Sequence, residues 1–169
     1  MANDSTSTIL AFRPPSVYRS DEVRARFHAL YDAKMETWPL PFEDRFLETG
    51  YGTVHVIVSG GEDGPAMLLL HASGVASWSW RANAAALGER FRLYAVDTIG
   101  DAGKSEYADL THVLRTREDQ AVFYDDIMER LGISEPAIVV GASEGGFIAS
   151  NLAVHRPGRV ERLILLGPM

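Results

Sequence analysis

Short apolar runs alternate with amphipathic stretches along most of the chain, from residue 66 to residue 169. Runs of this length are typical of strands covered on both faces, and apolar residues at helical spacing indicate helices. The expected strands are 66–70, 91–96, 137–140 and 160–166, and the expected helices are 80–87, 119–131 and 145–154. This alternation predicts an α/β fold with a mostly parallel, doubly wound sheet and right-handed crossovers. Ligands of such sheets bind at the carboxyl ends of the strands.

The segment before this alternation has the pattern of a β-hairpin. Residues 42–49 and 53–58 flank Gly50-Tyr51-Gly52, and a glycine-containing turn between two such runs favours antiparallel pairing. The hairpin is expected to add antiparallel strands at one edge of the sheet.

The first 41 residues are expected to form an extension in two parts. Residues up to about Val17 are polar and include Pro14-Pro15, which is typical of a flexible arm. Ser20 is the expected N-cap of an amphipathic helix with acidic residues in its first turn, which ends near Trp38-Pro39. An apolar stripe on this helix is expected to dock on the domain formed by residues 42–169 or on a lid: Val23, Phe27, Leu30, Tyr31 and Met35.

Composition excludes several classes of function. The 169 residues suit a single domain with its own core. With 16 basic and 23 acidic residues, the net charge of −7 argues against binding to nucleic acid or anionic lipid. The absence of cysteine excludes disulfides, thiolate metal sites and a cysteine nucleophile. The five histidines lie too far apart for zinc-ligand spacing, so neither a metal nor another cofactor is expected.

No targeting or membrane segment is evident in the sequence. The N-terminus lacks the basic start and apolar run of a signal peptide. No apolar stretch approaches the roughly 18 residues that a membrane helix needs. These features predict a cytoplasmic protein without a membrane partner.

The strongest chemical signal is Gly141-Ala142-Ser143-Glu144-Gly145, which Gly146 follows. It stands where an expected strand turns directly into a helix. There the serine takes a strained turn that projects its hydroxyl above the sheet edge, and the Glu144 amide points toward an oxyanion forming at Ser143. The alternatives are a tight connection or a phosphate-binding turn. The spacing is not that of Gly-x-Gly-x-x-Gly, and a dinucleotide turn usually follows the first strand.

Two further loops follow expected strands. Leu70-His71-Ala72-Ser73-Gly74 closes the first buried strand, and there the Ser73 amide is the candidate second donor to the oxyanion. His71 is expected to pack and brace this loop, not to catalyse. The loop that begins at Asp97 ends in Gly103-Lys104-Ser105, which invites a P-loop interpretation. That motif needs a glycine at position 98, where this chain has threonine, so the interpretation fails.

In their order along the chain, the hairpin, the His71 loop, the Asp97 loop and the Ser143 motif resemble the α/β-hydrolase superfamily, most closely its carboxylesterase-like branch with an N-terminal helical extension. The resemblance covers about residues 42–169 and extends to the N-terminal helix. It implies that Ser143 is the nucleophile and that the backbone amides of Glu144 and Ser73 form the oxyanion hole. The chain departs from the family's His-Gly dipeptide by having Ala72 in place of glycine, and its Asp97 loop has one residue more between its glycines.

The triad of this superfamily runs serine, acid, histidine along the chain. Only 26 residues follow Ser143, and the expected helix and strand occupy nearly all of them. His155 is the only histidine among them, and its place 12 residues along the helix puts it roughly 18 Å from the serine. The chain is therefore expected to be the N-terminal part of a truncated α/β-hydrolase fold, without the acid and histidine of the triad and nearly inactive alone.

Two functions stay open on the sequence. The first is a serine hydrolase that acts on a small ester-like substrate through an acyl-enzyme on Ser143. The second is a non-catalytic fragment or pseudoenzyme that associates, for example with itself, through the exposed edge of its last strand. Esterase, lipase, lactonase, peroxidase-type and C–C hydrolase chemistry are all compatible with the sequence. Trp78 and Trp80 are expected either to line a pocket wall or to pack the following helix.

Overall fold

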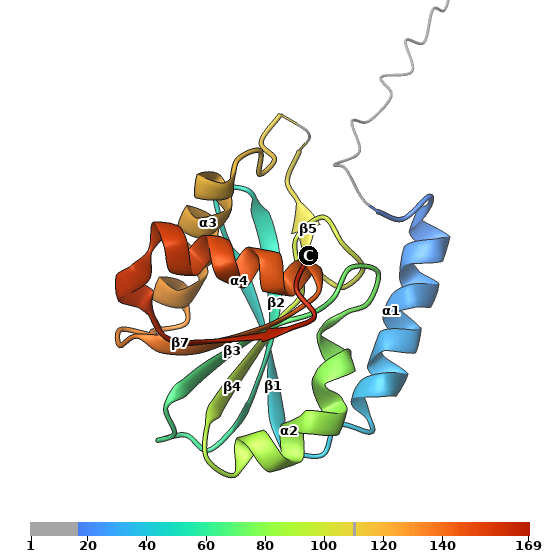
Figure 1. Cartoon of the computed structure of the whole chain (residues 1–169). Coiled ribbons are helices and arrows are strands. Elements are labelled where there is room, and N and C mark those ends of the chain that lie inside the picture. The colour runs from blue at the N-terminus through green and yellow to red at the C-terminus, as the bar shows by residue number, and fades with distance from the viewer. Residues whose placement is uncertain (1–16, 110) are drawn as a thin grey trace, which may run out of the picture.

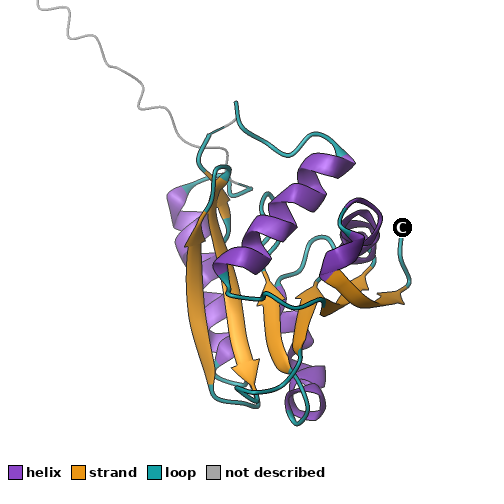
Figure 2. Cartoon of the chain, turned by 90° about the vertical axis from the view of Figure 1, so that its left-hand side faces the viewer, coloured by secondary structure: helices purple, strands orange, loops and turns teal. Residues whose placement is uncertain are grey.

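The computed structural model describes residues 17–109 and 111–169. A twisted sheet runs through the middle of the molecule, with helices on both of its faces (Figures 1 and 2). The flexible arm expected before Val17 lies outside the described residues. None of the helices in the described part is long and apolar enough to cross a membrane.

The sheet has seven strands in the order β1-β2-β4-β3-β6-β7, with the short β5 paired to β2. The hairpin strands β1 and β2 pair antiparallel at one edge, and β2 also pairs antiparallel with β4. From β4 onward the neighbouring strands are parallel. The strands are β1 (Phe42–Glu48), β2 (Gly52–Gly60), β3 (Ala66–Leu70), β4 (Arg92–Val96), β5 (Glu106–Tyr107), β6 (Ala137–Ala142) and β7 (Val160–Leu166). The predicted fold class and the edge hairpin are confirmed, whereas the two-residue strand β5 is too short for a sequence pattern and was not predicted.

Helices cover each face of the sheet, and the side chains of each strand alternate between the two faces. Leu68 and Leu70 pack with α3 and α4, whereas Met67 and Leu69 pack on the side of α1 and α2. The helices are α1 (Asp21–Met35), η1 (Ser77–Trp80), α2 (Arg81–Gly88), α3 (Arg117–Arg130), α4 (Glu144–His155) and η2 (Pro157–Arg159). Because β3 is covered on both faces, its run of apolar residues is buried on both sides, as the sequence predicted.

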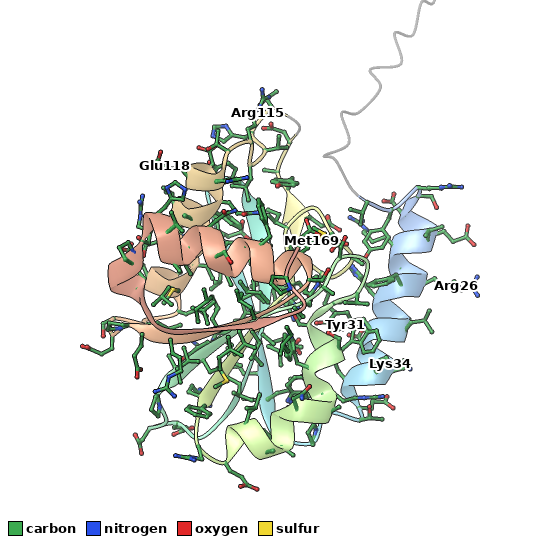
Figure 3. All side chains as sticks on the ribbon, viewed as in Figure 1. Arg26, Tyr31, Lys34, Arg115, Glu118 and Met169 are labelled. Atoms are coloured by element: carbon green, nitrogen blue, oxygen red, sulfur yellow. The ribbon has the colours of Figure 1, made fainter. Side chains whose placement is uncertain are left out.

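Helix α1 begins as expected, since the Ser20 side chain accepts a hydrogen bond from the Val23 amide. It ends at Met35, before the predicted end near Trp38. Tyr31 and Met35 are buried, which confirms that the helix docks on the domain. Figure 3 shows Tyr31 directed toward the domain and Arg26 directed away from it.

The predicted apolar stripe on α1 is wrong for two of its members. Val23 is 48% exposed and Leu30 is 59% exposed, whereas Phe27 is partly buried. Residues four apart share one helix face, and the face at positions 27, 31 and 35 is the one that meets the domain. Leu30 falls beside that face. Val23 lies in the first turn of α1, two steps of four before Tyr31, and the 3.6-residue period has by then rotated it away from the face that Tyr31 centres.

Candidate active site

Ser143 is the turn residue between β6 and α4, as predicted. It has φ 50° and ψ −114°, and it is the only non-glycine residue with positive φ in the described ranges 17–109 and 111–169. A backbone in such a sparsely populated region costs about 1–3 kcal/mol, which the surrounding structure must offset. The turn places Ser143 at the carboxyl end of a strand with a neighbour on each side, β3 and β7.

The glycines of the motif allow this turn because side chains would not fit at their positions. A Cβ at Gly141 would collide with the carbonyl group of Gly145, and one at Gly145 would collide with the carbonyl of Leu70. At Gly146, a Cβ would lie 2.9 Å from Cβ of Pro168. The start of α4 is therefore pressed against both its own strand and the neighbouring strand β3.

Backbone hydrogen bonds hold Ser143 in place. Its N–H donates to the Leu166 carbonyl at 3.0 Å, and its carbonyl accepts from Gly146 N–H at 2.9 Å and from Phe147 N–H at 3.2 Å. The end of β7 therefore supports the turn, and Figure 3 shows Met169 beside the start of α4. The Ser143 hydroxyl makes no hydrogen bond to any residue that the structure describes. The backbone hydrogen bonds therefore fix the backbone of Ser143 at the turn.

The loop after β3 lies beside this turn. Strands β3 and β6 are parallel neighbours with Leu70 opposite Gly141, so the residues that follow each strand emerge at the same edge of the sheet. The prediction that Ser143 lies at the carboxyl end of a central parallel strand, at the same edge as the loop from His71 to Gly74, is confirmed. Ser73 is exposed in this loop, and Glu144 is the first residue of α4.

His71 braces its loop, as expected. The Thr98 N–H donates to Nε2 of His71 at 2.9 Å, so this ring nitrogen is an acceptor and the proton lies on Nδ1. Nδ1 in turn donates to the Ala72 carbonyl at 2.8 Å. Both ring nitrogens are therefore engaged by backbone, and His71 has no free nitrogen with which to take a proton from Ser143.

The other four histidines lie away from the turn. His28 is in α1, His55 is in β2, His112 is in the loop before α3, and His155 is the last residue of α4. His155 is thus at the opposite end of α4 from Ser143, as the sequence indicated. The part of the chain that the structure describes contains no histidine that is hydrogen-bonded to Ser143, and no cluster of three or more His, Cys, Asp or Glu side chains that could hold a metal ion.

A small cavity borders the turn on the side of α2. It has a volume of about 240 Å³ and is lined by residues of the β3 loop, η1, α2 and the ends of β6 and β7: His71, Ala72, Val75, Ser79, Trp80, Asn83, Ala142 and Leu166. Trp80 therefore lines a pocket wall, whereas Trp78 packs under Lys34 of α1, whose Nζ lies 5.6 Å from the ring centre. Its place beside Ala142 puts this cavity next to the serine turn.

A buried polar cluster near the same edge was not predicted. Its centre is His55, whose Nδ1 lies 2.8 Å from Asp97 and whose Nε2 lies 2.6 Å from Asp44. Asp97 also accepts from Tyr31 at 3.3 Å and from the Ser77 and Lys104 amides at 2.8 and 2.9 Å. The position of Asp97 directly after a buried strand was the one sequence signal available. The distant partners of Asp97 come from α1, β2 and η1, and no local sequence pattern connects these three segments.

The charges in this cluster stabilise one another. Burial favours neutral His55, but the hydrogen bonds with Asp44 and Asp97 outweigh it and raise the pKa of His55 above its ordinary value. Burial likewise opposes the charge on Asp97, but the His55 hydrogen bond and positive charge hold the pKa of this carboxyl below its ordinary value. Both ring nitrogens of His55 thus face carboxylate oxygens, which favours the doubly protonated imidazolium. None of the hydrogen bonds of His55 or Asp97 involves Ser143.

Comparison with known proteins agrees with this geometry. The model of the alpha/beta hydrolase fold family matches residues 65–169. The chain belongs to the α/β-hydrolase family. Among curated relatives of this chain, carboxylesterase YbfK of Bacillus subtilis is 38% identical over 85% of the chain and 47% of the relative. The uncharacterized carboxylesterase nap of the same organism is 36% identical over 85% of the chain and 46% of the relative.

Solved structures show the same similarity in three dimensions. The crystal structure of carboxylesterase CesB (YbfK) from Bacillus subtilis has a TM-score of 0.80 at 38% identity, over 85% of this chain and 49% of that one. The naproxen esterase (carboxylesterase NP) from Bacillus subtilis has a TM-score of 0.82 at 35% identity, over 91% and 52%. The chain thus spans about half the length of the carboxylesterases that it matches.

Proposed function

We propose that the protein is a serine hydrolase that cleaves carboxylic esters through an acyl-enzyme on Ser143. The observation that carries the proposal is the strained Ser143 backbone between β6 and α4, beside the β3 loop. Proteins keep a serine in such a conformation where the surroundings impose it, and that occurs most often at functional sites. The similarity to proteins named carboxylesterases supports an ester as the substrate class.

Two backbone amides would stabilise the oxyanion that forms when Ser143 attacks the ester carbonyl. Glu144 is the first residue of α4, and the first N–H groups of a helix have no partner within the helix. The Ser73 amide is the second donor. The next amide along, that of Gly74, is already bound to the Asp101 carboxylate. Each such donor contributes about 10²–10³ to kcat in well-studied hydrolases.

Ser143 also needs a base, and its hydroxyl makes no hydrogen bond to a side chain of the described residues. We expect the acid and histidine to come from outside the 169 residues, so that the chain by itself is nearly inactive. The small cavity next to Ala142 would receive part of the substrate, with Trp80 as one wall.

The decisive experiment compares the full product of the gene with its Ser143→Ala variant in an assay of activated ester hydrolysis. We expect Ser143-dependent turnover, with a loss of several orders of magnitude on removal of the nucleophile. Equal activity of the two proteins would contradict the proposal. Trapping of an acyl group on Ser143, detected by mass spectrometry after an acid quench, identifies the intermediate directly.

A second candidate function is association without catalysis, and the edge strand β7 favours it. The apolar side chains of Ile164, Leu165 and Leu166 are 37%, 38% and 51% exposed along this strand. An exposed apolar strand at a sheet edge can pair with another chain. If association is the function, the protein forms dimers or larger species in sedimentation experiments, Leu165→Lys disrupts them, and no Ser143-dependent turnover is found.

A further inference from the structure

We propose that Asp101 is a positioning residue for the oxyanion hole, because it binds the Gly74 amide and thereby fixes the Ser73 amide in front of Ser143. The inference rests on the proposed function, since it assigns a role in the same reaction. Asp101 itself does not touch the reacting atoms. It lies in the loop after β4 and acts across the sheet edge on the loop after β3.

The contact between Asp101 and Gly74 uses both carboxylate oxygens. The Gly74 N–H lies 3.1 Å from Oδ1 and 3.0 Å from Oδ2, and the Ala102 N–H donates to Oδ1 at 2.7 Å. Hydrogen bonds to a charged acceptor are shorter and stronger than those between neutral groups. Gly74 has φ +75°, in the left-handed region, so the loop turns sharply at the residue that Asp101 holds.

A second contact anchors the other end of the same loop. His71 accepts from the Thr98 N–H at 2.9 Å, so the loop after β3 is attached to the loop after β4 at both His71 and Gly74. Only Ala72 and Ser73 lie between the two anchors. The direction of the Ser73 N–H is therefore set by two attachments, of which Asp101 supplies the one next to it.

The contact also decides which amide is free for an oxyanion. The Gly74 N–H is occupied, while the Ser73 N–H has no hydrogen-bond partner in the part of the chain that the structure describes. A free amide held in a fixed direction is what a preorganised oxyanion hole requires, because the donor then needs no reorientation during the reaction. Loss of Asp101 would release Gly74 as a competing donor and loosen Ser73.

The test uses the full gene product with Asp101→Ala and with Asp101→Asn. Asparagine keeps one acceptor oxygen for the Gly74 amide, whereas alanine keeps none. The matched control is Asp119→Ala. Asp119 also accepts a backbone amide, that of Thr116 at 3.0 Å, but it does so at the start of α3.

The first measurement, amide hydrogen exchange at Gly74 by NMR, does not depend on catalysis. We expect exchange to become about tenfold or more faster in Asp101→Ala, to stay close to wild type in Asp101→Asn, and to be unchanged in Asp119→Ala. Unchanged exchange in Asp101→Ala would overturn the proposal, because Asp101 would then not hold the loop.

The second measurement is ester hydrolysis, with kcat and KM determined separately. We expect Asp101→Ala to lower kcat about ten- to hundredfold with little change in KM, and Asp101→Asn to restore most of it, because the interaction acts in the transition state. A rise in KM alone, or an equal loss in Asp119→Ala, would contradict a positioning role. If wild type shows no Ser143-dependent turnover, the proposed function fails, and the exchange measurement still decides whether Asp101 positions the loop.

Discussion

The hydroxyl of Tyr31 in α1 donates a 3.3 Å hydrogen bond to Oδ1 of Asp97, the residue that follows β4. The helix is attached to the same loop at a second point, where Lys104 Nζ lies 2.6 Å from Asp32 and 4.8 Å from the centre of the Tyr31 ring. Because the Asp97 loop also holds His71, through Thr98, the N-terminal helix is mechanically linked to the loop beside Ser143. Helix α1 thus supports the loop after β4 and, through it, the loop beside Ser143.

Removal of the Tyr31 hydroxyl is expected to weaken this attachment. Tyr31→Phe keeps the buried ring but leaves one acceptor position of Asp97 without its donor. A buried hydrogen bond to a charged group is worth about 1.5–3 kcal/mol, and because this one is long we expect a loss of about 1 kcal/mol. Chemical denaturation of the wild type and of Tyr31→Phe measures this loss in the free energy of unfolding. Leu30→Ala, on the exposed side of the same helix, is the control and is expected to change stability by less than about 0.5 kcal/mol.

The buried His55 makes stability depend on pH, with a sign fixed by the direction of its shift. The pKa of His55 is raised in the folded state, so its contribution is complete below the ordinary pKa of about 6.5 and is lost as the pH rises through the raised value. The pKa values of Asp97 and Asp44 are lowered, so their contributions are present above the ordinary value and are lost as the pH falls through the lowered ones. Stability is therefore expected to peak in weakly acidic solution and to fall on the alkaline side.

Denaturation between about pH 5 and about pH 9 tests this expectation. The His55→Gln variant is the control, since glutamine occupies similar space without titrating, and its alkaline decline is expected to be shallower. A wild-type stability that stays level or rises across the alkaline half of the range would show that His55 is not the imidazolium of the cluster. NMR of the ring nitrogens provides a separate check, because both carry protons in the imidazolium.

Gly145→Ala is expected to be among the most disruptive single-methyl changes in the chain. The added Cβ would collide with the carbonyl of Leu70, the last residue of the central strand β3, and lie 2.6 Å from the carbonyl of His71 in the next position, and neither backbone atom can move aside. Overpacking of this kind costs about 1–3 kcal/mol. Gly158→Ala is the matched control, because a Cβ there meets nothing within 4 Å. Thermal unfolding of the two variants side by side measures the difference, and similar melting points would contradict the steric account of the turn.

The sequence predicted those features whose cause lies within a few residues. The glycines around Ser143 identify the turn, because their steric reason acts within the motif and on the next strand, and the β3 run identifies a strand covered on both faces. Leu30 was misplaced because its apolar side chain sits beside the docking face of α1, and only the position of the domain decides which face that is. The His55–Asp97 pair and the Asp101–Gly74 contact join residues 42 and 27 positions apart, so no local pattern connects them.

The 169-residue chain by itself is expected to hydrolyse an activated ester no faster than its own Ser143→Ala variant, within about tenfold. The amides of Glu144 and Ser73 are the proposed oxyanion donors. A serine hydroxyl without a base is a poor nucleophile at neutral pH, and His71 has both ring nitrogens bound to backbone. Any acceleration that remains would come from binding and from the amides, and neither depends on the Ser143 hydroxyl. A steady-state assay of the two proteins at equal concentration is sufficient. Rapid turnover that disappears in Ser143→Ala would show that the chain contains a base after all, and His71→Ala is then the next variant, because His71 is the histidine nearest to the turn along the paired strands β3 and β6.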